Sequence, residues 1–367
     1  MSGSPGSEIY RRSPFLVSYW YGPALVFENY LTRHKVAGDS FISSVLDFCG
    51  EGRTFKQLHA KFPELGQRTL HAGIRQLLKY SLLERLGKET KKADRKWEAW
   101  AYWNPGAAYF HFSTKDTEFE SNSDDSVKSL RELAKLQPLP PRVKRYRDAA
   151  AAKLQRVHGD SEFPEVLKTR RTWREFSIAP VERSKLEKLL WWSFGVQGWA
   201  KLSGVGNLAL KTSPSGGSLH PLEPYLFVRN VRGVRSGIYH YDAAGHRLEL
   251  LRRGANKAEI ERFLGGQKWA CEAAFVVFLT AVFARTQWKY KHPRAYRVVL
   301  AEAGHVCQTF CLAATWLGLA SFCTMALADT KIERALGIDG ITESVIYAMG
   351  AGMRPNREAT AERLRIK

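Results

Sequence analysis

The sequence predicts an α+β protein of two domains: a small helical module with a two-stranded wing, then a larger domain of buried strands and long helices. Two observations carry this prediction. Apolar residues recur at helical spacing in short segments of the first hundred residues, whereas long apolar runs bounded by turn residues occur in the second half. The length of 367 residues agrees with it, since domains average about 150 residues.

Residues 14–111 are predicted to form a winged-helix-like module. Leucine and isoleucine recur on one face of its third helix, and Thr54 can cap the second helix. A charged turn separates the two segments that would form the wing. The expected elements are helices at 40–49, from 54 onward and at 67–80, with strands at 82–86 and 97–102.

The third helix of this module carries a row of basic side chains. Arg68, His71, Arg75 and Lys79 decorate it in the way that a DNA-reading helix requires. A solvated basic face explains the same pattern, and a module of this kind can also bind a peptide.

The remaining domain boundaries of the chain are predicted from the composition of each segment. Residues 1–13 are expected to be disordered, and residues 358–367 to form a tail. Residues 112–160 are predicted to be a linker with a helix, because an acidic, serine-rich stretch precedes a stiff proline-rich segment at 137–141. The second domain then occupies residues 161–357.

Strands and helices of the second domain are predicted to form a layered core with a cleft at the strand ends. The run Val306–Ala328 is long enough to span a bilayer, but Gly318 interrupts it, so we expect a buried helix, a turn and a buried strand. The expected elements are helices at 181–194 and 296–316 and strands at 224–229, 237–241, 246–251, 273–283 and 344–349.

Composition excludes several classes of protein. Apolar residues make up 44% of the chain and aromatic residues 12%, which excludes a disordered chain, and the low glycine and proline content excludes a fibrous one. Lysine and arginine exceed the acidic residues by 20. This charge suggests nucleic acid, an anionic membrane surface or an acidic ligand as a partner. It is spread along the chain, so an acidic peptide explains it more simply than nucleic acid or a membrane.

The five cysteines form neither a disulfide framework nor a metal motif. Cys307 and Cys311 share a helix face, but no paired histidines accompany them, so both are interpreted as small core residues and no metal is expected. This usage indicates a reduced, cytoplasmic protein.

Four clusters in the second domain could carry chemistry: 170–176, 212–221, 288–297 and 350–357. The first and last are rich in arginine, whose fork matches phosphate oxygens. The second holds two glycines that let backbone amides approach a planar or anionic ligand. The third sets a lysine beside a tyrosine, which can supply a base. Taken singly, each is also explained as ordinary surface.

In this order, the clusters resemble the nitroreductase superfamily of FMN enzymes, and more narrowly the SagB-type dehydrogenases. Those enzymes oxidise thiazolines and oxazolines in ribosomal peptides to thiazoles and oxazoles. The resemblance covers about residues 161–357. It rests on Arg-Arg-Thr-x-Arg-x-Phe at 170–176, Pro-Ser-Gly-Gly-Ser-Leu-His-Pro-Leu-Glu at 214–223, Lys289-Tyr290 with Tyr296-Arg297, Glu-Ala-Gly-His-Val-x-Gln at 302–308, and Leu-Ala-Ala-x-x-Leu-Gly-Leu at 312–319. The family usually has asparagine where this chain has Thr309.

The resemblance implies a homodimer with FMN at the subunit interface. The implied roles fall to residues of all four clusters, to Gln308 and to the segment 324–326. Arg170, Thr172 and Arg174 would hold the phosphate and ribityl chain, with Arg354 or Arg357 completing the phosphate site. Ser215, Gly216 and Gly217 of the other subunit would lie along the flavin ring. Gln308 would belong to the flavin site, and Thr324, Met325 and Ala326 would bring backbone N–H groups near flavin N5.

The resemblance also implies the chemistry. Lys289 and Tyr290 match the pair that acts in azoline oxidation, in which a Cα proton is removed, a hydride passes to flavin N5, and O2 is the final acceptor. Either residue can be the base. The implied partners are an azoline-containing precursor peptide, bound by the N-terminal module through its leader, and a cyclodehydratase.

Two alternatives stay open. The same flavin chemistry could act on a carrier-bound thiazoline or in another amide or peptide dehydrogenation. A protein of another class, a nucleic-acid-binding regulator with a ligand-sensing domain, would explain the basic third helix but has no need of Lys289-Tyr290.

Overall fold

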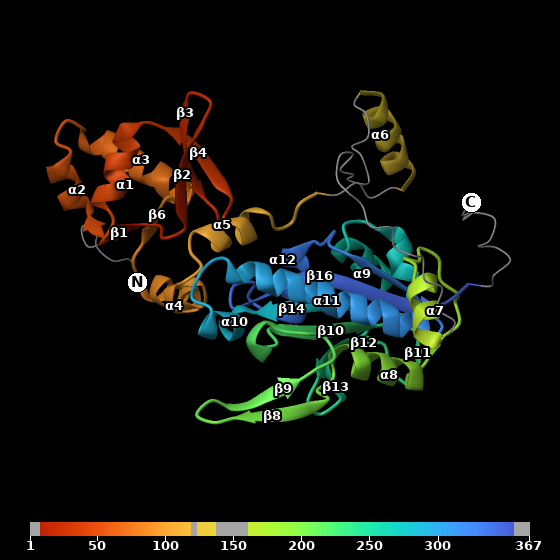
Figure 1. Cartoon of the computed structure of the whole chain (residues 1–367). Helices are drawn as coiled ribbons and strands as arrows, with labels where there is room; N and C mark the ends of the chain where they lie inside the picture. Colours follow the sequence, from red (N-terminus) through yellow and green to blue (C-terminus); the bar gives the residue numbers. More distant parts are fainter. Residues whose placement is uncertain (1–7, 119–122, 137–160, 356–367) are drawn as a thin grey trace, which may run out of the picture. The chain divides into compact units, whose positions relative to one another are not determined.

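A computed structural model describes residues 8–118, 123–136 and 161–355 (Figure 1). The chain divides into two compact units. Unit 1 comprises Met1–Lys115 and Phe283–Arg297, and unit 2 comprises Asp116–Val282 and Val298–Lys367. The segment 283–297 was expected in the second domain, but it packs with the N-terminal module.

Unit 1 combines two three-stranded sheets, β5-β1-β6 and β2-β3-β4, with short helices. Its described elements are, in chain order, β1 (Ile9–Arg12), β2 (Leu16–Tyr21), β3 (Ala24–Asn29), β4 (His34–Gly38), α1 (Ser40–Phe48), β5 (Arg53–Thr54), α2 (Phe55–Lys61), α3 (Gln67–Lys79), β6 (Leu83–Arg85), α4 (Lys88–Trp97), the 3-10 turn η1 (Glu98–Trp100), α5 (Gly106–Ser113) and α10 (Phe283–Lys289).

The three predicted helices and the predicted strand at 82–86 are confirmed, with bounds within a few residues. Thr54 caps α2 in a capping box: its hydroxyl accepts the Gln57 N–H, and the Gln57 side chain accepts the Thr54 N–H. On α3, Leu70, Ile74 and Leu77 are buried, as the periodicity indicated.

The predicted strand at 97–102 is wrong, and with it the wing. Residues 88–100 form α4 and η1, and β6 pairs antiparallel with β1 instead. Trp100 is fully buried in an aromatic cluster, so packing decides the conformation of this segment rather than its alternating pattern.

The expected disorder of residues 1–13 is wrong for its described part. Arg11 of β1 forms ion pairs with Glu84 of β6 at 3.1 Å and with Asp94 of α4 at 2.9 Å, which hold the strand in its sheet. Strands β2, β3 and β4 were not predicted. They form an antiparallel meander that buries Phe27.

A cluster of aromatic rings joins η1 and α5 to the segment 283–297. Trp100 packs against Phe283 at 4.6 Å between ring centroids and against His111 at 5.1 Å. The His111 Nδ1 lies 2.7 Å from the Tyr296 hydroxyl. The side chain of Gln287 accepts the Tyr102 N–H. These contacts explain why residues 283–297 belong to unit 1.

Unit 2 is built on a six-stranded antiparallel sheet of order β13-β12-β10-β14-β16-β15 (Figure 1). Its described elements are, in chain order, α6 (Ser123–Leu136), α7 (Glu162–Thr169), β7 (Val181–Glu182), α8 (Arg183–Phe194), β8 (Gly198–Leu202), β9 (Gly206–Leu210), the 3-10 turn η2 (Gly216–Ser218), β10 (Leu222–Val228), β11 (Val231–Arg232), β12 (Gly237–Asp242), β13 (Arg247–Arg253), α9 (Lys257–Phe263), the 3-10 turn η3 (Lys268–Glu272), β14 (Phe275–Val282), α11 (Ala295–Trp316, which begins in unit 1), β15 (Leu319–Thr324), α12 (Asp329–Leu336) and β16 (Glu343–Met353).

The central strand β14 is covered on both faces, as its uninterrupted apolar run predicted. Val276 and Phe278 point toward a core that includes residues of α9 and α12. Phe275 points to the other face, where its ring lies 6.5 Å from that of Phe310 on α11. The α+β class is therefore confirmed as a layered core, with helices on both sides of one sheet.

The run Val306–Ala328 is a helix, a turn and a strand, as predicted. Gly318 has φ 72°, which turns the chain from the end of α11 into β15. By length and composition alone, α11 is the one described helix that could cross a membrane, and half of its most apolar stretch is buried.

Two details of the second domain differ from expectation. The chain at Val181–Glu182 is a short strand, and the predicted helix begins at Arg183. Gly350 and Gly352 do not line an exit after the last strand but lie within β16. Glycine is required at Gly350 because a Cβ there would lie 2.5 Å from the Phe322 ring.

Candidate functional site

The arginine-rich segment lies along the edge of the large sheet. After α7, residues 170–177 run extended beside β15. Thr172 forms a parallel bridge with Ser321, and the Trp173 N–H donates to the Ser321 carbonyl at 2.9 Å. Arg170, Thr172 and Arg174 are therefore carried on one extended segment that is anchored to the sheet by its backbone.

The guanidinium groups of Arg170 and Arg174 differ from that of Arg354 in the ion pairs and hydrogen bonds that the structure gives them. Among the described residues, no ion pair involves Arg170 or Arg174, and the Arg174 guanidinium lies 5.8 Å from the centroid of the Trp269 ring. Arg354 donates to the carbonyls of Thr315 at 2.9 Å and Leu319 at 3.3 Å, around the C-terminus of α11. Two of its donors thus hold the helix end. Arg357 lies outside the described residues.

The glycine-rich loop forms the tight turn η2 before β10. Gly217 has φ 70°, a conformation that glycine adopts without strain. The Ser215 hydroxyl accepts the His220 N–H at 2.9 Å and donates to the Glu302 carboxylate at 2.7 Å. Ser215, Gly216 and Gly217 are all half-buried, so the loop is fixed from beneath while its backbone is partly open.

Glu302 of α11 is the anchor of this loop. The carboxylate is 4% exposed, and burial raises its pKa, while hydrogen bonds from Ser215 and the Gly216 N–H and the charge of Lys211 oppose the rise. Its other oxygen lies 3.8 Å from the His220 Nδ1. A cavity of about 20 Å³, large enough for one water molecule, adjoins it. Glu302 belongs to the motif at 302–308, but its role could not be predicted from the sequence, because its partners Ser215 and His220 lie 80 or more residues earlier.

Gln308 and Thr309 are neighbours on α11, but they differ in their contacts with the glycine loop. Gln308 is exposed. The Thr309 hydroxyl, where the family usually has asparagine, lies 2.7 Å from the Ser213 hydroxyl and donates to the His305 carbonyl. Thr309 thus ties the helix to the start of the glycine loop.

The segment 324–326 follows the edge strand β15. The Ala326 N–H donates to the Thr324 hydroxyl at 3.1 Å, so it serves the local turn. Met325 is 57% exposed, and within the described parts of the chain its N–H has no hydrogen-bond partner. Of the three expected backbone donors, that of Met325 is the one open to a ligand.

Lys289 and Tyr290 lie in unit 1, at the C-terminus of α10 rather than at a strand end. The Lys289 Nζ is 5.3 Å from the centroid of the Tyr290 ring, a cation–π arrangement. Lys289 is exposed and Tyr290 half-buried. The Trp103 indole donates to the Tyr290 carbonyl at 3.0 Å, which fixes the backbone of the pair.

A cavity of about 370 Å³ in unit 2 lies between α8 and the hairpin of β12 and β13. It is lined by Arg183, Arg235 and Arg247 among others, and by none of the residues predicted for the site. The predicted site residues of unit 2 therefore lie outside this cavity, some along the sheet edge at β15 and others in the glycine loop before β10.

Comparison with known proteins decides the family. The model of the nitroreductase family matches residues 167–353, just over half of the chain. The chain belongs to the nitroreductase family. The resemblance to this superfamily is thereby confirmed, and membership indicates an oxidoreductase.

Two curated relatives and one solved structure illustrate the likeness of this nitroreductase-family chain. The trifolitoxin-processing protein TfxB of Rhizobium leguminosarum bv. trifolii is 30% identical over 148 residues, which are 39% of this chain and 40% of TfxB. MJ1384 of Methanocaldococcus jannaschii, named as a nitroreductase, is 32% identical over 47% of this chain and 83% of that protein. The chain thus spans about two fifths of TfxB.

The solved structure supports the fold. It is the E. coli microcin synthetase McbBCD complex with truncated pro-MccB17 bound, with a TM-score of 0.50 at 20% identity over 71% of this chain and 97% of the matched chain. The match extends beyond the nitroreductase domain of this chain.

Proposed function

We propose that this protein is an FMN-dependent dehydrogenase that oxidises thiazoline or oxazoline rings in a precursor peptide to thiazoles or oxazoles. The observation that carries the proposal is a nitroreductase-family domain on a chain that also holds the Lys289–Tyr290 pair. The name of TfxB, a toxin-processing protein, and the bound peptide in the microcin synthetase structure support a peptide substrate.

The described residues fit an FMN molecule. Arg170 and Arg174 offer guanidinium forks outside any described ion pair, and Thr172 between them is exposed. The loop at Gly217 offers a partly open backbone, and the Met325 N–H offers a hydrogen-bond donor. We assign the phosphate to the first group and the ring to the second, with Arg354 holding the α11 terminus beside them.

Bound FMN would supply a two-electron acceptor for the hydride. The protein's own residues then have to hold the azoline and remove its Cα proton. We assign that proton to Lys289 and Tyr290, one as base and the other as its electrostatic partner. A carrier-bound thiazoline, or another amide or peptide bond, would require the same two residues.

The partners are part of the proposal. An excess of 20 positive charges attracts an acidic leader peptide, and the outer strands of the two sheets of unit 1 are places where a peptide strand could pair. A cyclodehydratase would supply the azoline, and a homodimer would complete the flavin site.

Arg174→Ala tests the flavin site. Loss of one guanidinium leaves the phosphate poorly paired, so we expect FMN occupancy to fall at least tenfold, since one charge-assisted hydrogen bond is worth about 1.5–3 kcal/mol. Flavin absorbance after heat release measures it. Arg171→Ala is the matched control, because Arg171 is exposed and its hydrogen bonds among the described residues go to the nearby Lys168 and Arg170 carbonyls. Equal occupancy in both variants would move the phosphate site elsewhere.

A further inference from the structure

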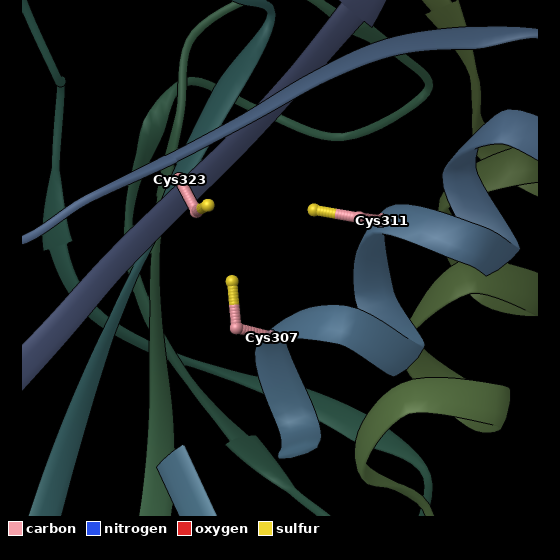
Figure 2. Close-up of side chains that lie close together, drawn as sticks. All are labelled: Cys307, Cys311 and Cys323. Carbon is pink, nitrogen blue, oxygen red and sulfur yellow. The ribbon is translucent and has the colours of Figure 1, made fainter. Parts of the chain in front are cut away.

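Three cysteine side chains meet between α11 and β15 (Figure 2). The sulfur atoms of Cys307, Cys311 and Cys323 all lie within 4.8 Å of one another. Cys307 and Cys311 are buried, and Cys323 is half-buried. The sequence showed the first two on one helix face, but it could not show that a third thiol, from the following strand, points at them.

The two elements that carry these thiols fix their directions. Cys307 and Cys311 are one helical turn apart, so both point to the face of α11 that covers the sheet. On β15, Phe322 packs into the core with α12, and the next side chain, Cys323, therefore points to the opposite face, toward α11. The cluster is thus set by the regular geometry of a helix and a strand, not by a loop.

Two polar side chains stand around the cluster. The Tyr347 hydroxyl hydrogen-bonds to the Cys323 sulfur, and the charge of Arg170 acts on the same sulfur. A cation beside the cluster and a tyrosine donor are what a metal–thiolate group needs around it.

We propose that Cys307, Cys311 and Cys323 bind one thiophilic metal ion, with Zn²⁺ the expected occupant. Zinc bonds to thiolate sulfur at about 2.3 Å, which sets tetrahedral sulfurs about 3.8 Å apart, so a contraction of about 1 Å or less closes the site. Each thiol loses its proton to solvent as its sulfur–metal bond forms, and no electron is transferred. No described histidine or carboxylate joins the group, so the fourth position belongs to a solvent oxygen or stays empty in a three-coordinate site.

The buried Ser321 hydroxyl supports an oxygen in the fourth position. Ser321 is two residues before Cys323 on β15 and so shares its face. It is 1% exposed, and in the described part of the chain its Oγ reaches no hydrogen-bond partner besides the Cys311 thiol. A metal-bound water would satisfy it. The bound ion would brace α11 against β15, the two elements that carry Glu302 and the segment 324–326.

The test is metal binding by the full-length chain. Reduced protein is stripped with a chelator, passed through a desalting column and titrated with ZnCl₂, and bound zinc is counted by plasma mass spectrometry. We expect one zinc per chain and protection of three thiols from alkylation, mapped to Cys307, Cys311 and Cys323. A parallel titration with Cu⁺ distinguishes the two thiophilic ions: tighter Cu⁺ binding without bound water indicates the three-coordinate form.

Variants make the assignment specific. Cys323→Ser keeps the size of a half-buried side chain, and we expect zinc affinity to fall at least 100-fold, since even outer-shell partners of a metal are worth 10- to 100-fold. Cys271→Ala, which removes a buried thiol outside the cluster, controls for a general effect of losing a core cysteine. Circular dichroism checks that each variant is folded.

Three results would overturn the proposal. One is no stoichiometric zinc in the wild-type chain. Another is zinc binding unchanged in Cys323→Ser and in the double variant Cys307→Ala/Cys311→Ala. The third is loss of free thiols in the cluster through a disulfide under the reducing conditions used. The zinc count is independent of flavin, so failure of the proposed azoline chemistry leaves this test intact.

Discussion

At the scale of single residues, Glu302 explains how the glycine loop keeps its shape. One buried carboxylate accepts the Ser215 hydroxyl and the Gly216 N–H, and Ser215 in turn accepts the His220 N–H. A network of this kind is costly to leave half satisfied. The loop is therefore rigid before any ligand arrives, as a site that must hold a planar ring requires.

Lys289 and Tyr290 carry the residue-scale prediction for catalysis. Lys289→Ala and Tyr290→Phe should keep FMN and lower the oxidation of an azoline peptide at least 100-fold, because general acid–base groups contribute about 10²–10⁴-fold. Mass spectrometry of the peptide and flavin absorbance of the protein measure the two effects.

Lys291→Ala is the matched control for this pair. Its ammonium lies 5.1 Å from the Tyr102 ring, so it makes the same kind of contact two residues away. We expect near-normal turnover. Turnover equal to wild type in Lys289→Ala and Tyr290→Phe would reject their catalytic role.

At the residue scale, a sequence can point to neighbours in the chain but not to distant partners. Lys289 and Tyr290 are adjacent in the sequence, and the structure adds a cation–π contact between them, while their catalytic role stays a prediction. The roles of Glu302 and Cys323 depend on contacts with Ser215 and Cys307, from other elements. No periodicity encodes such contacts.

At the scale of elements, the edge of the large sheet depends on small residues in β16. Gly350 faces Phe322 of β15, and a Cβ would lie 2.5 Å from the ring and 3.0 Å from the Phe275 carbonyl oxygen. This strand pair holds the extended arginine segment through Ser321 and Met353. The site therefore depends on the close approach of these strands.

Gly350→Ala should lower the free energy of unfolding by about 1–3 kcal/mol, as overpacking of a core does, and should also lower FMN occupancy. Gly304→Ala in α11 is the control, because a Cβ there meets no atom within 4 Å. We expect it to be neutral or to stabilise by up to about 1 kcal/mol, since alanine is the better helix former. Urea unfolding measures both, and equal effects would contradict the close-packing argument.

The aromatic cluster of unit 1 holds a neutral histidine. Burial keeps the pKa of His111 well below its usual range, with a smaller contribution from Lys115. Below about pH 6.5 the unfolded chain takes up a proton that the folded chain does not, so stability falls with falling pH. The wild-type protein should lose up to about 1.4 kcal/mol per pH unit below pH 6.5 from this group.

Urea unfolding at pH 7.5 and pH 5.5, followed by tryptophan fluorescence, measures this loss. His111→Gln has no proton to take up, so the difference between the two pH values should shrink by about that amount. An unchanged difference would show that His111 does not control the acid sensitivity of unit 1.

The errors in element prediction share a physical cause. The segment 97–102 alternates like a strand, yet Trp100 and Trp103 are fully buried and their rings pack with Phe283, nearly 200 residues later. Tertiary packing overrides local pattern where aromatic burial is large. Long apolar runs such as β14 and α11 were predicted well, because the apolar residues of each segment are enough to predict that it is buried.

At the scale of the whole molecule, the length predicted two domains, and the structure has two units with a different boundary. The segment 283–297, which carries Lys289 and Tyr290, packs with the N-terminal module, so the predicted catalytic pair and the predicted flavin residues belong to different units. The net charge of +20 is spread over both. It suits attraction of an acidic peptide, which added salt should weaken.

The most direct test of the account joins cofactor and substrate in one experiment. Purified full-length protein is examined for flavin and then incubated in air with a synthetic peptide that bears a thiazoline or an oxazoline. The account predicts a yellow protein that releases FMN on heating and a peptide that loses about two daltons, the mass of two hydrogens. A colourless protein that leaves the peptide unchanged and shifts duplex DNA would contradict it.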